Sequence, residues 1–182
     1  MRFKDLSRSE MTEAQLRVVD DAVAGKRGSA PPPLIAWLPS PELAQRAQKL
    51  GEFVRFDTSL APPLSELAIL VTARHWTSHF EWFAHKRIAL AAGIDAAVID
   101  AIARRAEPQL EDPKAKAVYA FSRALHEGRA VPADIYDEAM RQLGQKAVVE
   151  LVGILGYYTL VSMTLNTFEV GLPEGETSGL AP

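Results

Sequence analysis

The sequence predicts an all-α protein. Apolar residues recur at helical spacing along most of the 182-residue chain, and no alternating apolar–polar run is long enough to indicate a strand. Prolines and glycines divide the chain into segments of helical length. A length of 182 residues is typical of one domain, so we expect a single domain over residues 1–182 with about seven or eight helices.

Two helices are expected in the N-terminal third. Residues 12–24 form the first, with Thr12 as its cap. Residues 28–41 contain five prolines and are expected to form a loop. Residues 41–56 form the second helix, which begins with a proline in its first turn and has a predicted core stripe of Leu43, Ala47, Leu50 and Val54.

The remainder of the chain is predicted to be helical with short breaks. A long tract over residues 64–92 carries most of the polar residues of interest. Gly153 and Gly156 are expected to let another helix approach closely, and residues 173–182 to form a loose tail. The later helices are predicted at residues 95–105, 113–127, 132–143 and 146–168.

Composition excludes several classes of function. The net charge of −3 and the scattered Lys and Arg residues give no indication of nucleic-acid binding. The absence of cysteine excludes disulfides, thiolate metal sites and a cysteine nucleophile. The charged N-terminus has no apolar core typical of a signal peptide, and the apolar run over residues 151–165 is too short to span a bilayer. We therefore expect a cytoplasmic protein with no membrane or nucleic-acid partner.

Residues 66–85 hold the strongest candidates for chemistry. Ionisable side chains in an apolar helical tract are costly unless they are paired. Ser78, Glu81 and His85 are spaced three and four apart, so a helix places them on one face. Glu66 can join them only if the tract breaks, and residues 75–77 are the expected break. A carboxylate and an imidazole brought together in this way form a general acid–base pair.

Each of these residues also has a structural interpretation. Ser78 and Glu81 match a capping box, which satisfies the amides at a helix N-terminus. Glu81 and His85 match a surface pair four residues apart. Glu66 could instead form a salt bridge with Arg74 or Arg55. Spacing alone leaves these alternatives open.

Several segments, taken in order, resemble a known family. They are LGEFVRFDTSL, SELAILVTARHW, EWFAHKRIALAAGI, AVYAFSRAL and VVELVGILGYYTLVSMTLNTF. In order and spacing they resemble the carboxymuconolactone decarboxylase family, which shares the all-helical alkyl hydroperoxidase D-like fold. The resemblance extends from about residue 40 to residue 172.

The resemblance implies a branch of the family without thiol chemistry. The peroxidase pattern is a Glu, a Cys twelve positions later, then Cys and His three and seven positions further on. That frame falls on Glu66, Ser78, Glu81 and His85, so both cysteines are replaced. A serine and a carboxylate cannot cycle through a disulfide. The resemblance therefore implies the founding reaction of the family, in which a carboxylated lactone from aromatic catabolism loses carbon dioxide without cofactor or metal.

We expect the four residues of this frame to be catalytic and the substrate to be a small carboxylated molecule. An arginine is the natural group to hold a substrate carboxylate. The residues expected to bind substrate are Arg55, Arg74, His79, Trp82 and Tyr157. We expect no cofactor and no metal ligand. The family also implies a homo-oligomer, a trimer or a hexamer, and the aromatic residues between Trp76 and Phe83 together with the apolar closing helix suggest surface that meets another subunit.

Two other classes of function remain open. One is a metal-dependent enzyme with Glu66, Glu81, His85 and His79 as ligands. The other is a helical oligomer that binds or organises other molecules without catalysis. Of the three hypotheses, the resemblance favours the decarboxylase-like enzyme.

Overall fold

The computed structural model describes residues 2–4 and 6–181, and within these ranges every regular element is helical. Eight α-helices follow a short 3-10 helix at Arg8–Glu10. They are α1 (Glu13–Ala24), α2 (Pro32–Trp37), α3 (Pro41–Phe56), α4 (Pro62–His75), α5 (His79–Ala91), α6 (Ala96–Ala103), α7 (Pro113–Gly128) and α8 (Ala133–Thr167). The predicted fold class is confirmed.

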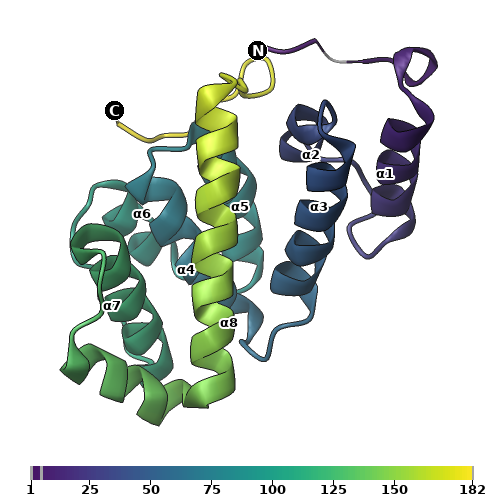
Figure 1. Ribbon diagram of the computed structural model, residues 1–182. Coiled ribbons are helices and arrows are strands. Elements are labelled where there is room, and N and C mark those ends of the chain that lie inside the picture. The colour runs from purple at the N-terminus through teal and green to yellow at the C-terminus, as the bar shows by residue number, and fades with distance from the viewer. Residues whose placement is uncertain (1, 5, 182) are drawn as a thin grey trace.

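Helix α4 is the centre of the molecule. Every residue from Leu64 to Arg74 is buried, and α4 packs against α5, α6, α7 and α8. A helix that is buried on all sides needs apolar residues on all sides, which this sequence supplies. Figure 1 shows α2 and α3 on one side of α8 and α6 and α7 on the other. The single carboxylate on this helix, Glu66, is therefore forced into the interior and requires a partner.

The predicted break in the long helical tract is confirmed. Helix α4 ends at His75 and α5 begins at His79, and Thr77 between them has a left-handed φ of 45°. The Asn166 side chain of α8 donates a hydrogen bond to the Trp76 carbonyl at 2.8 Å, which stabilises the turn between α4 and α5. Helices α4 and α5 then pack side by side.

Helix α8 changes direction at Gly144, whose φ of 80° and ψ of 163° are non-helical. Figure 1 shows a short first part and a long second part that runs through the middle of the bundle. This matches the two closing helices predicted around Gly144. By length and composition alone α8 could cross a membrane, but 61% of its most apolar stretch is buried inside the protein, as expected of a core helix.

Two predictions about the N-terminal third are wrong. The proline-rich segment contains helix α2, which is attached to α8 by a 2.8 Å hydrogen bond from Trp37 Nε1 to Thr164 Oγ1. On α3, Leu43 and Leu50 are exposed, and the buried face consists instead of Ala44, Ala47, Gln48, Gly51 and Val54. Small residues face the bundle because they allow its helices to approach closely.

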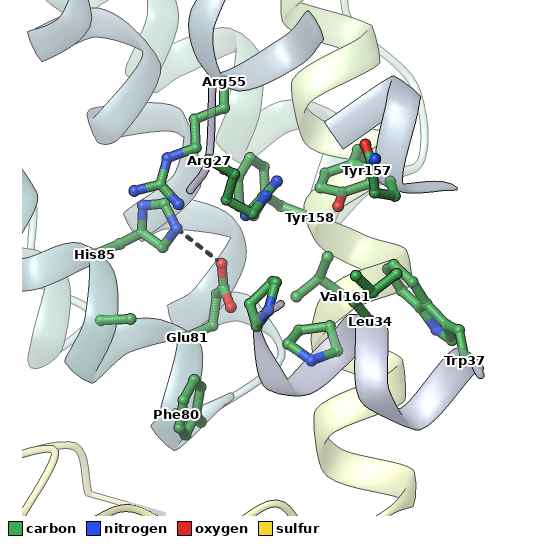
Figure 2. A pocket seen from close by; sticks show the side chains of 14 residues that line it. Arg27, Leu34, Trp37, Arg55, Phe80, Glu81, His85, Tyr157, Tyr158 and Val161 are labelled. Atoms are coloured by element: carbon green, nitrogen blue, oxygen red, sulfur yellow. Dashed lines mark ion pairs between the residues drawn. The ribbon is translucent and has the colours of Figure 1, made fainter. Parts of the chain in front are cut away.

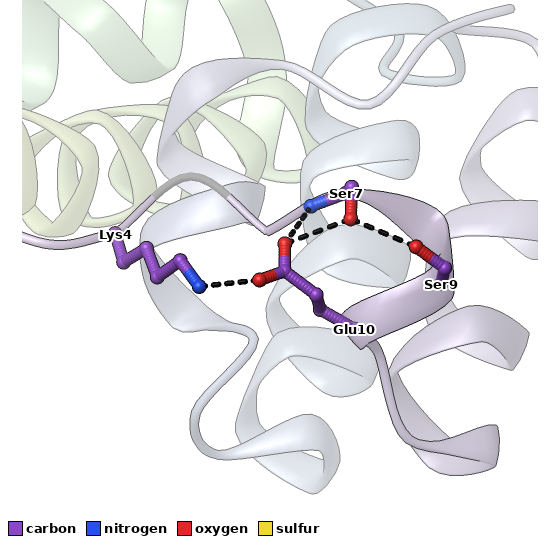
Figure 3. A network of polar contacts seen from close by, with 4 residues as sticks. All are labelled: Lys4, Ser7, Ser9 and Glu10. Atoms are coloured by element: carbon purple, nitrogen blue, oxygen red, sulfur yellow. Dashed lines mark hydrogen bonds and ion pairs between the residues drawn. The ribbon is translucent and has the colours of Figure 1, made fainter.

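The two chain ends are held in different ways, the N-terminal segment by polar contacts within residues 4–10 and part of the C-terminal tail by burial. The Glu10 carboxylate accepts hydrogen bonds from the Ser7 amide at 3.0 Å and the Ser7 hydroxyl at 2.7 Å, and it pairs with Lys4 (Figure 3). At the other end, the tail expected to be loose has no helix, yet Ser178 and Leu180 are buried against the body.

Candidate functional site

Helices α4 and α5 bring Glu66, Glu81 and His85 into one buried cluster, named here the Glu–His–Glu triad. His85 Nδ1 lies 2.7 Å from Glu66 Oε2, and His85 Nε2 lies 3.0 Å from Glu81 Oε1. The three side chains are 4–7% exposed. The predicted convergence of Glu66 and His85 is thus present in the structure, with Glu81 as a second carboxylate on the imidazole.

The two carboxylates hold a proton on the imidazole. Burial by itself would lower the pKa of His85, but the charge of Glu81 and the hydrogen bonds to both carboxylates outweigh it, so the pKa is raised to about 9. At neutral pH His85 is therefore an imidazolium that donates N–H groups to Glu66 and Glu81. The triad stores one proton between two carboxylates in the interior.

Two members of the triad, Glu81 and His85, form part of the wall of a small pocket (Figure 2). Its free volume is about 70 Å³, whereas one water needs roughly 10–15 Å³ on the same measure. Glu81 and His85 line this pocket and Glu66 lies behind His85. The other lining residues come from the loops and helices of the first third and from α5 and α8: Arg27, Pro31, Pro33, Leu34, Trp37, Gln48, Arg55, Phe80, Ala84, Tyr157, Tyr158 and Val161.

Two arginines give the pocket a positive charge. Arg27 and Arg55 line it, and neither forms an ion pair with a carboxylate among the residues that the structure describes. Together with the imidazolium they outnumber the two carboxylates by one charge. Arg27 Nη2 and Gln48 Nε2 are buried donors with no partner within the described chain. Unpaired buried donors are costly, so a ligand with acceptor oxygens would stabilise them.

Two tyrosines complete the wall. The Tyr158 ring meets the His85 ring edge-on at 5.0 Å between centroids, and Tyr157 packs edge-on against Tyr158 at 5.3 Å. Burial raises the pKa of both hydroxyls, so they stay protonated. A Cβ on Gly51 would lie 2.1 Å from the Tyr157 hydroxyl, so only glycine leaves room for this side chain.

The structure corrects the predicted role of Ser78. It stands at the N-cap position of α5, but its side chain makes no capping hydrogen bond and its hydroxyl has no partner among the described residues. The capping box is absent because the Glu81 carboxylate is bonded to His85. Ser78 is fully buried and does not line the pocket, so it is not placed to act on a substrate there as expected.

Three of the five residues predicted to bind substrate lie elsewhere. Arg55 and Tyr157 line the pocket. Arg74 bonds instead to the Ala103 carbonyl and the Thr77 hydroxyl. His79 is exposed and lies 2.6 Å from the Ser178 hydroxyl, and Trp82 is a fully buried core residue. Sequence proximity to Glu81 and His85 was a poor guide here because successive residues of a helix point to different sides.

The sequence did not identify Arg27, Gln48 or Tyr158 as site residues. Arg27 lies in an irregular loop after α1, where no periodicity indicates which way a side chain points. Gln48 lies on the buried face of α3, and a polar residue at a core position of a helix is a signal that could have found it.

A metal at the triad would have to displace a carboxylate from the imidazole, because both ring nitrogens are already hydrogen-bonded. Over residues 2–4 and 6–181, no group of three or more His, Asp or Glu side chains is arranged to hold a metal ion. His79, the fourth candidate ligand, bonds to Ser178 outside the pocket. The arrangement is suited to moving a proton.

Comparisons with known proteins identify the fold. No family model matches the chain, and no curated protein matches it in sequence. Among solved structures, the debrominase Bmp8 superposes with a TM-score of 0.71 at 15% identity, over 93% of this chain and 91% of that one. A second solved structure is that of ATU0492 from Agrobacterium tumefaciens, a protein of unknown function described as a candidate antioxidant defence protein AhpD. It superposes with a TM-score of 0.67 at 15% identity, over 75% of this chain and 94% of that one.

The fold is AhpD-like. This confirms the fold that the resemblance implied. At 15% identity the likeness extends to the fold and leaves the chemistry to be argued from the site itself.

Proposed function

We propose that this AhpD-like protein is a carboxymuconolactone decarboxylase-like enzyme, a cofactor-free lyase or isomerase acting on a small carboxylated lactone or related acid. The observation that carries the proposal is the Glu–His–Glu triad, in which a protonated imidazole stands between two carboxylates at the wall of a pocket. That one of its structural neighbours is a debrominase supports an enzymatic role for the fold.

In this proposal Arg27 and Arg55 bind the substrate carboxylate. Both guanidinium groups line the pocket without a carboxylate partner, and the pocket has one positive charge in excess. A guanidinium binds a carboxylate through two parallel N–H donors, which also fixes its orientation. Gln48 Nε2 supplies a further donor for a lactone or carbonyl oxygen.

The triad then supplies the proton that decarboxylation requires. When the bond between the substrate carbon and its carboxylate breaks, carbon dioxide leaves and the electron pair stays on the substrate, spread into the adjacent unsaturated system. The proton shared between His85 Nε2 and Glu81 Oε1 is transferred to the substrate carbon, and solvent later restores it. Glu66 touches only the far side of His85, so it is a positioning residue that keeps the imidazole oriented and charged.

Carbon dioxide release from carboxylated lactones and small aromatic acids tests this proposal. Glu81→Gln and His85→Gln should each lower kcat by about 100-fold or more. His85→Gln removes the proton donor, and Glu81→Gln removes a carboxylate that keeps the imidazole protonated. Glu150→Gln is the matched control, because Glu150 is also a buried carboxylate but bonds to Ser59 outside the pocket. Wild-type turnover in Glu81→Gln, or an equal loss in Glu150→Gln, would contradict the proposal.

Substitution of a pocket arginine, followed by measurement of KM, tests the proposed substrate binding. Arg55→Gln should raise KM for the carboxylated substrate by about tenfold with a smaller effect on kcat. Arg46→Gln is its control, because Arg46 lies on the same helix but is exposed and paired with Glu42. An unchanged KM in Arg55→Gln would remove this arginine from the binding role.

We also propose that the protein acts as a cytoplasmic homo-oligomer, a trimer or hexamer. Trp82 belongs to the core, so the aromatic cluster of α5 gives less support to this than expected. Stronger support comes from large apolar side chains exposed on α3 and α8, which a subunit interface would cover. They are Leu43, Leu50, Phe53, Phe56, Val149, Val152, Leu160 and Met163.

A further inference from the structure

A second pocket lies between α4, α6 and α7 and shares no residue with the first. Its free volume is about 110 Å³. Polar and basic side chains dominate its lining, which consists of Val71, Arg74, His75, Ile102, Arg105, Tyr119, Arg123, His126 and Glu127. The proposed decarboxylation uses none of these residues.

Arg74 is the most unusual member of this lining. It is only 5% exposed, yet no carboxylate of the described residues lies within ion-pair distance of it. Its Nε donates to the Ala103 carbonyl at 2.9 Å and its Nη1 to the Thr77 hydroxyl at 2.8 Å. Neither acceptor carries a charge, and Nη2 has no acceptor among the described residues. A buried guanidinium without an anion is costly, so an anionic partner from outside the chain would stabilise it.

Two helix ends position the two arginines. Thr77 and Arg105 both adopt left-handed conformations, with φ of 45° and 58°. The Thr77 hydroxyl also accepts from Arg105 Nη2 at 3.3 Å, so it joins the two guanidinium groups. Both residues follow the C-terminus of a helix, α4 and α6, where a left-handed residue commonly ends the helix. The two helix ends therefore bring the two arginines to the same hydroxyl.

The remaining charges leave the pocket positive. Arg123 is compensated by ion pairs with Glu107 and with Glu127. The rings of His75 and His126 stack at 4.8 Å, and burial together with neighbouring charges lowers the pKa of both, to about 4 for His126. The histidines are therefore uncharged at neutral pH. Three arginines against Glu107 and Glu127 leave one positive charge in excess, and neither Arg74 nor Arg105 forms an ion pair within the described chain.

We propose that this second pocket binds the phosphate or carboxylate group of a small molecule, held by the guanidinium groups of Arg74 and Arg105. The Thr77 hydroxyl accepts hydrogen bonds from both guanidinium groups and holds them close together. Their remaining N–H groups can then donate to the oxygens of one anion. The Tyr119 and His75 side chains in the lining add polar contacts for the rest of the ligand. The site is independent of the proposed lyase activity.

Titration of the full chain with sodium phosphate and, separately, sodium acetate tests this, with sodium chloride keeping the ionic strength constant. Binding is followed by the imidazole NMR signals of His75 and His126. Saturable changes with phosphate or with acetate are expected, and the anion that binds tighter identifies the ligand group. Arg105→Gln should weaken binding by at least about tenfold. Arg104→Gln, an exposed neighbour outside this pocket, should leave it unchanged.

Arg74→Gln should have the same effect as Arg105→Gln if it folds. Arg105 is exposed, so its substitution keeps the test valid if Arg74→Gln does not fold. The proposal is overturned if neither anion gives a saturable response beyond that of chloride, or if the response persists in Arg105→Gln. An equal loss in Arg104→Gln would also overturn it, because it would show general charge screening.

Discussion

The protonated imidazole of the Glu–His–Glu triad should make the protein less stable in alkaline solution. The pKa of His85 is about 9 in the folded protein against 6.5 for an ordinary histidine. Because the folded value is the higher one, the stabilisation is fully present below about pH 6.5 and is lost as the pH rises through about 9. At about 1.4 kcal/mol per pH unit, the total loss is about 3 kcal/mol.

The measurement needs a reference protein with an uncharged triad, because Lys, Tyr and the other histidines also titrate over this pH range and change the free energy of unfolding. Replacement of Glu66, Glu81 and His85 by Gln removes every titrating group of the triad while keeping hydrogen-bonding side chains in place. Urea unfolding of both proteins from about pH 6 to pH 10 gives the difference in their free energies of unfolding. We expect the wild type to lose about 3 kcal/mol relative to the variant over this range. A difference independent of pH would refute the charged triad.

Three further predictions concern packing, redox chemistry and assembly. In urea unfolding, Gly51→Ala should lower the free energy of unfolding by about 1–3 kcal/mol, because the new Cβ would collide with Tyr157. Gly153→Ala is the control, since its Cβ would meet only Val54 at 3.8 Å, and it should be neutral or stabilising. Metal-free protein should not reduce an alkyl hydroperoxide with a dithiol donor, because the chain has no cysteine; robust turnover would contradict this. Light scattering at micromolar concentration should give the mass of an oligomer. The double variant Phe53→Glu, Val149→Glu should lower that mass towards the mass of a single chain. A wild type that is already monomeric would refute the interface on α3 and α8.

The sequence predicted the helices well where glycine and proline separate them. Thr12 caps α1 as expected, with its hydroxyl accepting from the Gln15 amide at 3.3 Å, and Gly144 divides α8. Helix α2 was missed because a run of prolines was interpreted as a loop. Proline lacks only the amide hydrogen that the first turn of a helix leaves unbonded, so Pro32 and Pro33 can begin a helix.

The pairing of Glu66 with His85 could be predicted because its physical cause is local. A carboxylate on the apolar α4 must find a partner, and the break before α5 determines which residues can reach it. The rest of the pocket depends on contacts between distant parts of the chain. Arg27 comes from a loop without periodicity, and the tight contact predicted at Gly153 and Gly156 occurs instead at Gly51, where Tyr157 of α8 meets α3.

The protonation state of His85 at neutral pH is the property on which the proposed proton transfer depends. Nitrogen-15 NMR of histidine-labelled protein measures it directly, with His85 assigned from the His85→Gln variant. We predict that Nδ1 and Nε2 of His85 both carry a proton at pH 7 and that the ring titrates with a pKa of about 9. In Glu66→Gln and Glu81→Gln the pKa should fall, since each removes a carboxylate that raises it. A neutral His85 ring at pH 7 in the wild type would contradict the proposed role of the triad as proton donor.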